Sequence, residues 1–373
     1  MSVATPALVL PAGFRVSVAP MMDWTDRHCR SFHRLLSRRA WLYTEMVTAQ
    51  AIAHGDLDHL LGRGEEGERV VLQLGGNDPQ LLARAAREGQ TYGYDEINLN
   101  CGCPSDRVRE GAFGACLMAE PERVADCVAA MQAVVQVPVT VKHRIGIDRR
   151  EDYEFVHRFV DVVAAAGCRR FVVHARNAWL DGLDPKQNRE IPPLRYEVVH
   201  RLAQDFPHCA FELNGGLQDL AHGLAAVCPE GAEDGRPATR LVGAMYGRRA
   251  YHDPWLLAGV DDWLARHAAE APVTDAAQPL TRAAVVEALV GYLERGAAHG
   301  VEVRHLARHV LGLYLGQPAA RLWRRMLSES RALSRNDPGL LREACAAVEA
   351  EAARGLPQRC PDGAEAQARK LRT

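Results

Sequence analysis

Short apolar runs recur along the first two thirds of the chain, separated by stretches long enough to hold a helix. Each run has the length and apolar content of a buried strand. Two of the intervening stretches begin with helix-start signals, at Asp78-Pro79 and at Pro121. The eight runs cover residues 16–21, 41–44, 70–74, 96–99, 139–143, 171–174, 210–214 and 241–245. Eight β-then-α units in about 250 residues predict a (β/α)8 TIM barrel, with a doubly wound open sheet as the alternative.

Nearly every predicted strand ends in polar or reactive residues. In a (β/α)8 barrel the carboxyl ends of the strands meet on one face, and function gathers there. The residues at these ends are Pro20-Met21-Met22-Asp23, Glu45, Gln73, Asn100 with Cys103, Lys142-His143-Arg144, His174-Ala175-Arg176, Asn214-Gly215-Gly216 and Gly247-Arg248. This ring predicts the active site of an enzyme at the mouth of the barrel.

The chain changes character after residue 262. Residues 266–280 are rich in Ala, Pro and Thr and lack an apolar period, which predicts a linker. The pattern is helical from there to about residue 353, as in the stripe of Leu306, Val310 and Leu313. We therefore expect a catalytic barrel domain over 1–265, a linker over 266–280, an all-helical domain over 281–355 and a disordered tail over 356–373.

The segment 96–105 runs from a strand into a thiol, Cys103, followed by proline. The next segment, 106–115, is basic and punctuated by glycine, which predicts a mobile loop beside the thiol. The plain alternatives for Cys103 are a small buried side chain or half of a metal site. Cys101 and Cys103 are the only close pair among ten cysteines, so a zinc site is not expected. Their scattered spacing favours a reducing compartment over a disulfide framework.

Glycines follow the last two predicted strands, where barrels hold phosphate groups. Gly215-Gly216 would let backbone N–H groups approach an anion, and Arg248 would add a charge-assisted contact; a simple turn is the alternative. Gln73 and Lys142 stand where they would reach a flat ring system on the barrel mouth. A lysine there would stabilise the anion of a reduced flavin, and a barrel-end salt bridge is its alternative role.

Charged residues make up 25% of the chain and the net charge is −2, so any basic surface is local. No apolar run approaches about 18 residues, and the N-terminus lacks the order of a secretion signal, so we expect a cytoplasmic protein without a membrane span. Between residues 302 and 335 arginines outnumber glutamates by seven to two. This excess predicts either a phosphate-binding surface or an ordinary solvated helix face.

Several motifs in order resemble those of the tRNA-dihydrouridine synthase family. They comprise residues 18–26, the Asn-Leu-Asn-x-Gly-Cys-Pro-Ser run at 98–105, and residues 141–148, 173–176, 214–216 and 246–248. Residues 309–314 and 321–325 extend the match into the helical part. Residues 186–194 are similar to the A-type subgroup, which modifies uridines 20 and 20a of the tRNA D-loop. The resemblance implies an enzyme that uses FMN and NADPH to reduce the C5=C6 bond of uridine.

The resemblance also implies roles for individual residues. Hydride would pass from flavin N5 to uracil C6, Cys103 would donate the proton to C5 as general acid, and Asn100 would orient the uracil. An ordinary thiol is mostly protonated at neutral pH and can still give up its proton. FMN would contact Pro20, Met21, Met22, Gln73, Lys142, His174, Asn214, Gly215, Gly216, Gly247 and Arg248. The D-loop and elbow of the tRNA would contact Arg144, Arg176, Lys186, Arg189, Arg304, Arg308, Arg321, Arg324 and Arg325, on a protein expected to be a monomer without metal.

Two features depart from the family pattern. Cys101 stands where the family often has an aliphatic or small polar residue, and strand alternation should point it away from Cys103. Residues 228–240 resemble an insertion before the last strand. The competing hypotheses are a flavin barrel oxidoreductase acting on a small-molecule enone or pyrimidine, and an RNA-binding protein that has lost catalysis.

Overall fold

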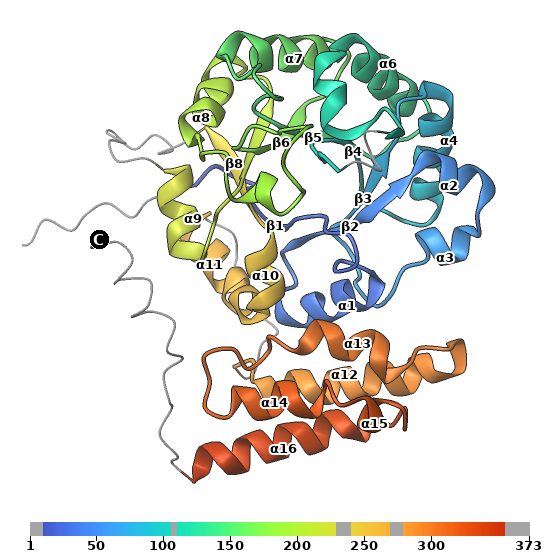
Figure 1. Ribbon diagram of the computed structural model, residues 1–373, viewed down its shortest axis with the longest axis vertical. Coiled ribbons are helices and arrows are strands. Elements are labelled where there is room, and N and C mark those ends of the chain that lie inside the picture. The colour runs from blue at the N-terminus through green and yellow to red at the C-terminus, as the bar shows by residue number, and fades with distance from the viewer. Residues whose placement is uncertain (1–9, 106–109, 229–239, 269–278, 355–373) are drawn as a thin grey trace, which may run out of the picture. The chain divides into compact units, whose positions relative to one another are not determined.

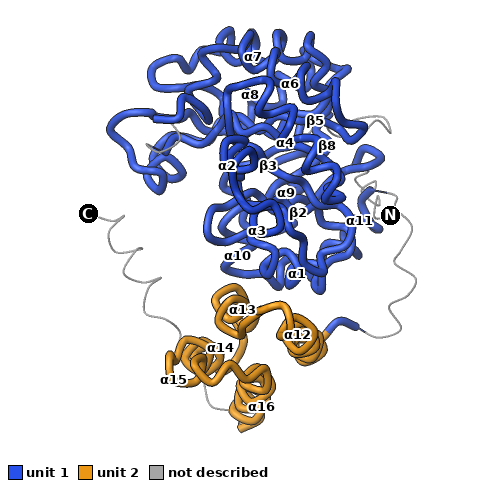
Figure 2. The backbone as a smooth tube through the Cα atoms, turned by 90° about the vertical axis from the view of Figure 1, so that its right-hand side faces the viewer, with its two compact units in different colours: residues 1–280 blue, residues 281–373 orange. Residues whose placement is uncertain are grey.

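The structure is a computed structural model that describes residues 10–105, 110–228, 240–268 and 279–354. Its backbone divides into two compact units, Met1–Leu280 and Thr281–Thr373 (Figure 2). Part of the predicted active-site loop (106–109), most of the predicted linker and insertion, and the predicted tail lie outside the described residues. Each unit is considered by itself below.

The first unit contains a closed barrel of eight parallel strands in sequence order (Figure 1). Because the strands are parallel, all their carboxyl ends lie on one face. The strands are β1 (Arg15–Val18), β2 (Trp41–Thr48), β3 (Val70–Gly75), β4 (Glu96–Cys101), β5 (Val139–Arg144), β6 (Arg170–His174), β7 (Ala210–Asn214) and β8 (Leu241–Tyr246). The predicted TIM barrel is confirmed.

Two strand boundaries differ from the prediction. Strand β1 ends at Val18 rather than Met21, because Pro20 has no N–H to donate and the Met21 N–H instead bonds to Oγ1 of Thr25 at 3.0 Å. Strand β2 continues to Thr48 rather than ending at Thr44. Its pairing with β3 shifts register between Tyr43 and Met46, and such a bulge interrupts the alternation from which a strand is read.

Helices lie between the strands around the barrel (Figure 1). Those with the predicted start signals begin as expected, since the Asp78 side chain caps α4 and a proline opens both α4 and α6. The helices are α1 (Arg27–Leu36), α2 (Ala49–His54), α3 (Leu57–Leu61), α4 (Pro79–Thr91), α6 (Pro121–Gln132), α7 (Tyr153–Ala165), α8 (Tyr196–Asp205), α9 (Leu220–Val227), α10 (Arg248–His252) and α11 (Val260–His267). Short 3-10 turns cover Gly114–Ala119, Gln187–Arg189 and Pro254–Gly259.

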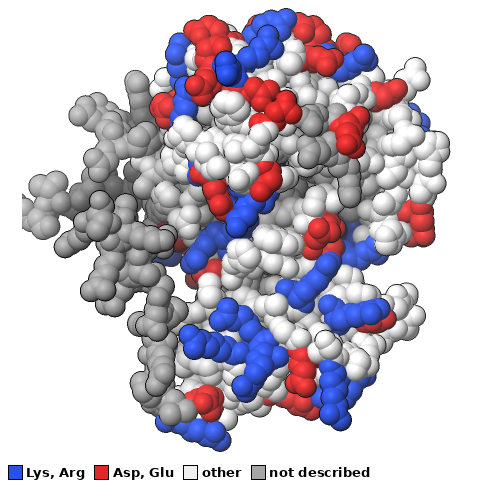
Figure 3. Space-filling view, viewed as in Figure 1, with Lys and Arg blue, Asp and Glu red and all other residues white. Residues whose placement is uncertain are grey.

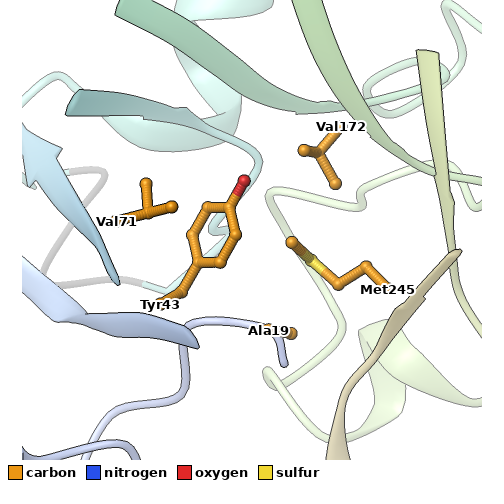
Figure 4. Packing of buried hydrophobic residues seen from close by; sticks show 5 residues of the cluster. All are labelled: Ala19, Tyr43, Val71, Val172 and Met245. Atoms are coloured by element: carbon orange, nitrogen blue, oxygen red, sulfur yellow. The ribbon is translucent and has the colours of Figure 1, made fainter. Parts of the chain in front are cut away.

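The barrel interior is filled by side chains. An apolar cluster comes from five strands or strand ends, and its members point toward one another (Figure 4): Ala19, Tyr43, Val71, Val172 and Met245. Two fully buried carboxylates also lie inside, Glu96 and Glu212. Arg15 pairs with Glu96 at 2.6 Å, and Arg170 pairs with Glu212 at 2.9 Å. The barrel is therefore closed by a packed core, and any ligand must sit at its mouth.

The described residues of the second unit form helices joined by turns, with no strand among them. It consists of α12 (Arg282–Gly296), a 3-10 turn (Ala297–His299), α13 (Val303–Val310), α14 (Ala320–Met326), α15 (Ser330–Leu333) and α16 (Gly339–Ala353). Its centre holds the fully buried Trp323, whose indole N–H donates to the carbonyl of Val310 at 2.8 Å. Across both units, none of the helices within the described ranges has the length and apolar character needed to cross a bilayer.

Candidate active site

The residues predicted to contact a flavin all come from strand ends on one face of the barrel. Pro20, Met21 and Met22 follow β1, Gln73 lies in β3, and Lys142 lies in β5. The remainder belong to the ends of β6, β7 and β8: His174, Asn214, Gly215, Gly216, Gly247 and Arg248. Lys142 and Asn214 meet directly, since Nζ of Lys142 donates to Oδ1 of Asn214 at 3.0 Å.

Cys103 follows β4 in a tight turn that the Asn100 side chain holds. Oδ1 of Asn100 accepts from the backbone N–H groups of Gly102 and Cys103, each at 3.0 Å. The Cys103 thiol is partly exposed and lies 3.4 Å from Oγ of Ser105. Cys101 is fully buried, and burial raises the pKa of its thiol well above the ordinary value. As predicted, Cys101 lies apart from the Cys103 thiol. The reason is that β4 ends at Cys101 and Cys103 lies in the turn beyond it, rather than strand alternation; of the two thiols, only that of Cys103 is partly exposed.

Three cations interact electrostatically with Cys103. They are Lys142 and Arg144 from β5 and Arg189 from the segment after β6. Burial, and then the neighbouring Arg144, lowers the pKa of Lys142 to about 7. Burial likewise lowers the pKa of Arg144 to about 10. The Cys103 thiol therefore lies among basic side chains from two strand ends of the mouth.

His174 and the glycines after β7 form a second part of the mouth. Burial, followed by the positive charge of Arg144 and Lys142, lowers the pKa of His174 well below its usual value, so the imidazole is neutral. Gly215 has φ +118°, and a Cβ there would lie 2.8 Å from the His174 ring. Gly216 has φ +69°, and a Cβ there would lie 2.5 Å from Leu194. Side chains are thereby excluded from this turn, leaving its backbone as the surface that a ligand meets.

Arg144, predicted to contact tRNA, is almost completely buried. Its Nε donates to the carbonyl of Gly102 at 3.1 Å, and its Nη1 donates to the carbonyls of Asn177 at 3.1 Å and Asn188 at 2.9 Å. One guanidinium therefore joins the Cys103 turn to the segment after β6. The Gly102 peptide is held from both sides, with its N–H on Asn100 and its carbonyl on Arg144.

Two more residues predicted to contact ligands also make internal contacts. Nη1 of Arg176 donates to the carbonyls of Pro192 and, at 3.3 Å, Glu190. Nη1 of Arg248 pairs with the Glu190 carboxylate at 2.7 Å, and this contact lowers the pKa of Glu190. The segment between β6 and α8 is thus fastened to two strand ends. Lys186 and Arg189, on the same segment, are exposed.

The other arginines predicted to bind tRNA lie on two helices of the second unit. Arg304 and Arg308 share α13, and both side chains are exposed, with Arg304 paired to Glu302 at 2.6 Å. Arg321, Arg324 and Arg325 lie on α14, exposed on the side away from the buried Trp323. Lys and Arg side chains gather on the face of this unit seen in Figure 3. Within the described residues no carboxylate pairs with the three arginines of α14, which leaves their charge available to an anion.

Several residues of the site were not predicted from the sequence. Asn98 and Thr140 carry hydrogen bonds beneath the mouth. Asn188 anchors the segment after β6 through four hydrogen bonds of its side chain to Trp179, Leu183 and Asp184. The sequence does contain a pattern that could have indicated the buried polar residues Asn98 and Thr140. Buried strands that place a polar residue at every second position, as in Glu96-x-Asn98-x-Asn100, indicate a polar barrel interior. Asn188 has no such signal, because its partners are backbone groups of a loop.

Known proteins are similar to this chain over most of its length. The family model for dihydrouridine synthases (Dus) matches residues 17–351. A tRNA-dihydrouridine(20/20a) synthase of a Synechocystis species is 51% identical over 336 residues, which cover 88% of this chain and 93% of that protein. Proteins with the same name from Salmonella typhimurium and Escherichia coli are 50% and 51% identical, covering 92% and 86% of this chain and 98% and 91% of their own length.

These similarities extend over the barrel and the helical unit alike. The matched range includes the eight strand ends, the Cys103 turn and the arginines of α13 and α14. The chain belongs to the dihydrouridine synthase family, whose members are flavin-dependent oxidoreductases that act on tRNA.

Proposed function

We propose that this chain uses FMN and NADPH to reduce the C5=C6 bond of uridines 20 and 20a in the D-loop of tRNA. Family membership supports uridine reduction in tRNA, and relatives at about 50% identity are named for positions 20 and 20a. The observation that carries the chemistry is the Cys103 thiol, partly exposed, held by Asn100 and flanked by three cations. We further propose that the protein works as a cytoplasmic monomer.

The residues at the mouth fit FMN. Two successive glycines with positive φ make a backbone concavity of the kind that binds anions. Arg248, which pairs with Glu190 at 2.7 Å, would add a charge-assisted contact to the phosphate. Lys142 would lie against the ring system with Gln73 and Asn214, and a cation there favours the reduced, anionic flavin. Pro20, Met21, Met22, His174 and Gly247 would complete the contacts. When bound and reduced, FMN supplies the hydride that uracil C6 accepts.

Cys103 supplies the proton that completes the reduction. As C6 gains hydride, negative charge develops on C5 and O4 of the uracil. The Cys103 thiol donates its proton to C5, so the S–H bond breaks as the C5–H bond forms and the charge passes to sulfur. Lys142, Arg144 and Arg189 lie near enough to interact with that charge, and the thiol then regains a proton from solvent. Asn100, which holds the turn with its oxygen, would orient the uracil with its remaining amide proton.

The target base must leave the folded tRNA to reach this site. Flipping a base costs a few kcal/mol, which contacts elsewhere on the RNA must offset. The exposed arginines of α13 and α14 are suited to contact phosphates, and Lys186 and Arg189 are suited to contact nucleotides near the mouth. Their charge and exposure support the proposed tRNA-binding role of both groups.

A reconstitution experiment tests this proposal. The purified protein should carry FMN, and NADPH consumption should rise on addition of full-length folded tRNA, with dihydrouridine found in the tRNA by mass spectrometry. Uridine monophosphate and small cyclic enones serve as alternative substrates. Faster turnover of a small molecule than of tRNA would favour a small-molecule oxidoreductase, and tRNA binding without bound flavin would favour a non-catalytic RNA-binding protein.

Replacing Arg324 and Arg325 together by alanine should weaken tRNA binding. Removing one phosphate contact lowers the slope of log K against log salt by about 0.7 to 0.9, so we expect a slope reduced by roughly 1–2. Reduction of FMN by NADPH should stay unchanged, because none of the residues proposed to contact FMN is altered. Binding is measured by retardation or fluorescence across a salt series.

The control is a second pair of exposed arginines, Arg84 and Arg87, which lie three positions apart on α4. Their replacement by alanine should leave the salt slope within error of the unmodified protein. An unchanged slope in the Arg324 and Arg325 variant, or an equal drop in the α4 variant, would assign the α14 arginines to an ordinary solvated surface.

A further inference from the structure

A series of hydrogen-bonded side chains runs from the Cys103 turn to Glu96 along the neighbouring strands β3, β4 and β5. Nδ2 of Asn100 donates to Oε1 of Gln73 at 2.8 Å, and Nε2 of Gln73 donates to Oδ1 of Asn98 at 2.8 Å. Nδ2 of Asn98 donates to Oγ1 of Thr140 at 2.9 Å, and that hydroxyl donates to Oε1 of Glu96 at 2.7 Å. The five side chains come from β3, β4 and β5, and none is more than 8% exposed.

The groups at the two ends of this series of hydrogen bonds fix which atoms donate and which accept along it. At one end, Oδ1 of Asn100 accepts from the backbone N–H groups of Gly102 and Cys103, which can only donate. At the other end lies the Glu96 carboxylate, which Arg15 pairs at 2.6 Å and which can only accept. Every amide between them must therefore turn its oxygen toward Cys103 and its nitrogen toward Glu96. A reversed amide would leave buried polar groups unpaired, at a cost of about 1–3 kcal/mol each.

Thr140 carries the one hydroxyl among these five hydrogen-bonded side chains. The hydroxyl accepts from Asn98 and donates to Glu96. Without this hydroxyl, Nδ2 of the buried Asn98 loses its acceptor, and only the Cys103 end is left to orient the amides. Glu96 keeps Arg15 and the Tyr43 hydroxyl, the latter at 3.4 Å, so the carboxylate remains held. Loss of the hydroxyl therefore acts on the amides between Thr140 and the Cys103 turn, and on its longer contact with the carbonyl of Ile97 at 3.4 Å.

We propose that Thr140 is a positioning residue for Cys103. Its hydroxyl orients the Asn98 and Gln73 amides, which in turn aim the Asn100 oxygen that holds the Cys103 turn. This inference rests on the proposed role of Cys103 as proton donor. Thr140 itself lies two residues before Lys142, below the mouth, and acts on the reaction only through this series of hydrogen bonds.

Two substitutions separate the hydroxyl from the shape of the side chain. Thr140→Val keeps the shape and removes the hydroxyl, whereas Thr140→Ser keeps the hydroxyl. With rates normalised to bound FMN, we expect kcat for dihydrouridine formation to fall about tenfold in Thr140→Val, equivalent to about 1.4 kcal/mol, with KM for tRNA nearly unchanged. Thr140→Ser should stay within about twofold of the unmodified protein in both constants.

A second readout does not depend on turnover. The rate at which iodoacetamide alkylates Cys103, followed by mass spectrometry without tRNA, should change several-fold in Thr140→Val and stay as in the unmodified protein in Thr140→Ser. Alkylation is also measured in Asn100→Ala, which removes the last link directly and should change the rate in the same direction. Cys103→Ala, assayed in parallel, reports on the proton-donor role alone. If Cys103→Ala stayed active, the proposed acid would be wrong, while the alkylation contrast would still decide on positioning.

Equal kcat and equal alkylation in the valine and serine variants would overturn the proposal, as would equal decreases in both. Should Thr140→Val not fold, Thr140→Ala provides a smaller variant without the hydroxyl. If neither folded while Thr140→Ser folded and was active, the hydroxyl would serve stability and the positioning role would be rejected.

Discussion

Replacing Cys103 by alanine will leave a protein that binds FMN and tRNA but forms dihydrouridine at least about 10²-fold more slowly, as for removal of a general acid. The thiol is the proposed proton donor, and it contributes no backbone contact, since its turn is held through main-chain groups. FMN content is checked by absorbance, tRNA affinity by titration and product by mass spectrometry. Reduction of bound FMN by NADPH should proceed at the unmodified rate.

Cys101→Ala is the matched control. This thiol lies two residues away, is fully buried, and has the buried Cys127 among its neighbours rather than the mouth. Its replacement should leave activity within a few-fold of the unmodified protein. A normal yield from Cys103→Ala would assign the acid to another group, and a decrease in Cys101→Ala equal to that in Cys103→Ala would show that the assay reports structural damage.

Replacing Gly215 by alanine should weaken FMN binding by about tenfold or more. A residue with a Cβ at φ +118° is strained by about 1–3 kcal/mol, and the added atom would lie 2.8 Å from the His174 ring. The backbone strain and the close contact are relieved only if the glycine turn or the His174 imidazole moves. The turn and the imidazole are each proposed to contact the cofactor. Binding is measured by quenching of FMN fluorescence on titration of the apoprotein.

Gly13→Ala provides the comparison for this variant. Gly13 has φ +71°, precedes β1, and would meet nothing within 4 Å if given a Cβ. Alanine at position 13 therefore has the same kind of backbone strain but makes no new contact at the mouth. The FMN affinity of the Gly13→Ala variant should be unchanged. An FMN affinity in Gly215→Ala within twofold of the unmodified protein would contradict the assignment of the glycine turn to the cofactor.

The sequence predicted the barrel well because strand ends in a parallel barrel share one face. Residues as distant as Gln73, Lys142 and Asn214 could be placed together by counting strands alone. Boundaries were wrong where local chemistry departs from alternation. Examples are the β1 end, where Thr25 captures the Met21 N–H, and the register shift of β2.

The roles of the mouth residues were harder to predict. Arg144 carries a charge that suits RNA, yet its guanidinium binds three backbone carbonyls from two distant loops. Every residue has a backbone carbonyl, so the sequence does not show which carbonyls accept these hydrogen bonds. The pairing of Arg248 with the Glu190 carboxylate joins residues 58 positions apart, and no local pattern relates the two. These contacts depend on how the segment after β6 folds over the mouth.

A map of the reduced uridines is the decisive measurement for the proposed reaction. Full-length folded tRNA lacking dihydrouridine is incubated with the FMN-loaded protein and NADPH, with Cys103→Ala in parallel, and each reduced uridine is located by mass spectrometry of ribonuclease fragments. We predict dihydrouridine at positions 20 and 20a only, none above background with Cys103→Ala, and poor reduction of an isolated D-arm. Reduction at positions 16 or 17 instead, or no reduction by protein that holds FMN and oxidises NADPH, would contradict the proposed reaction.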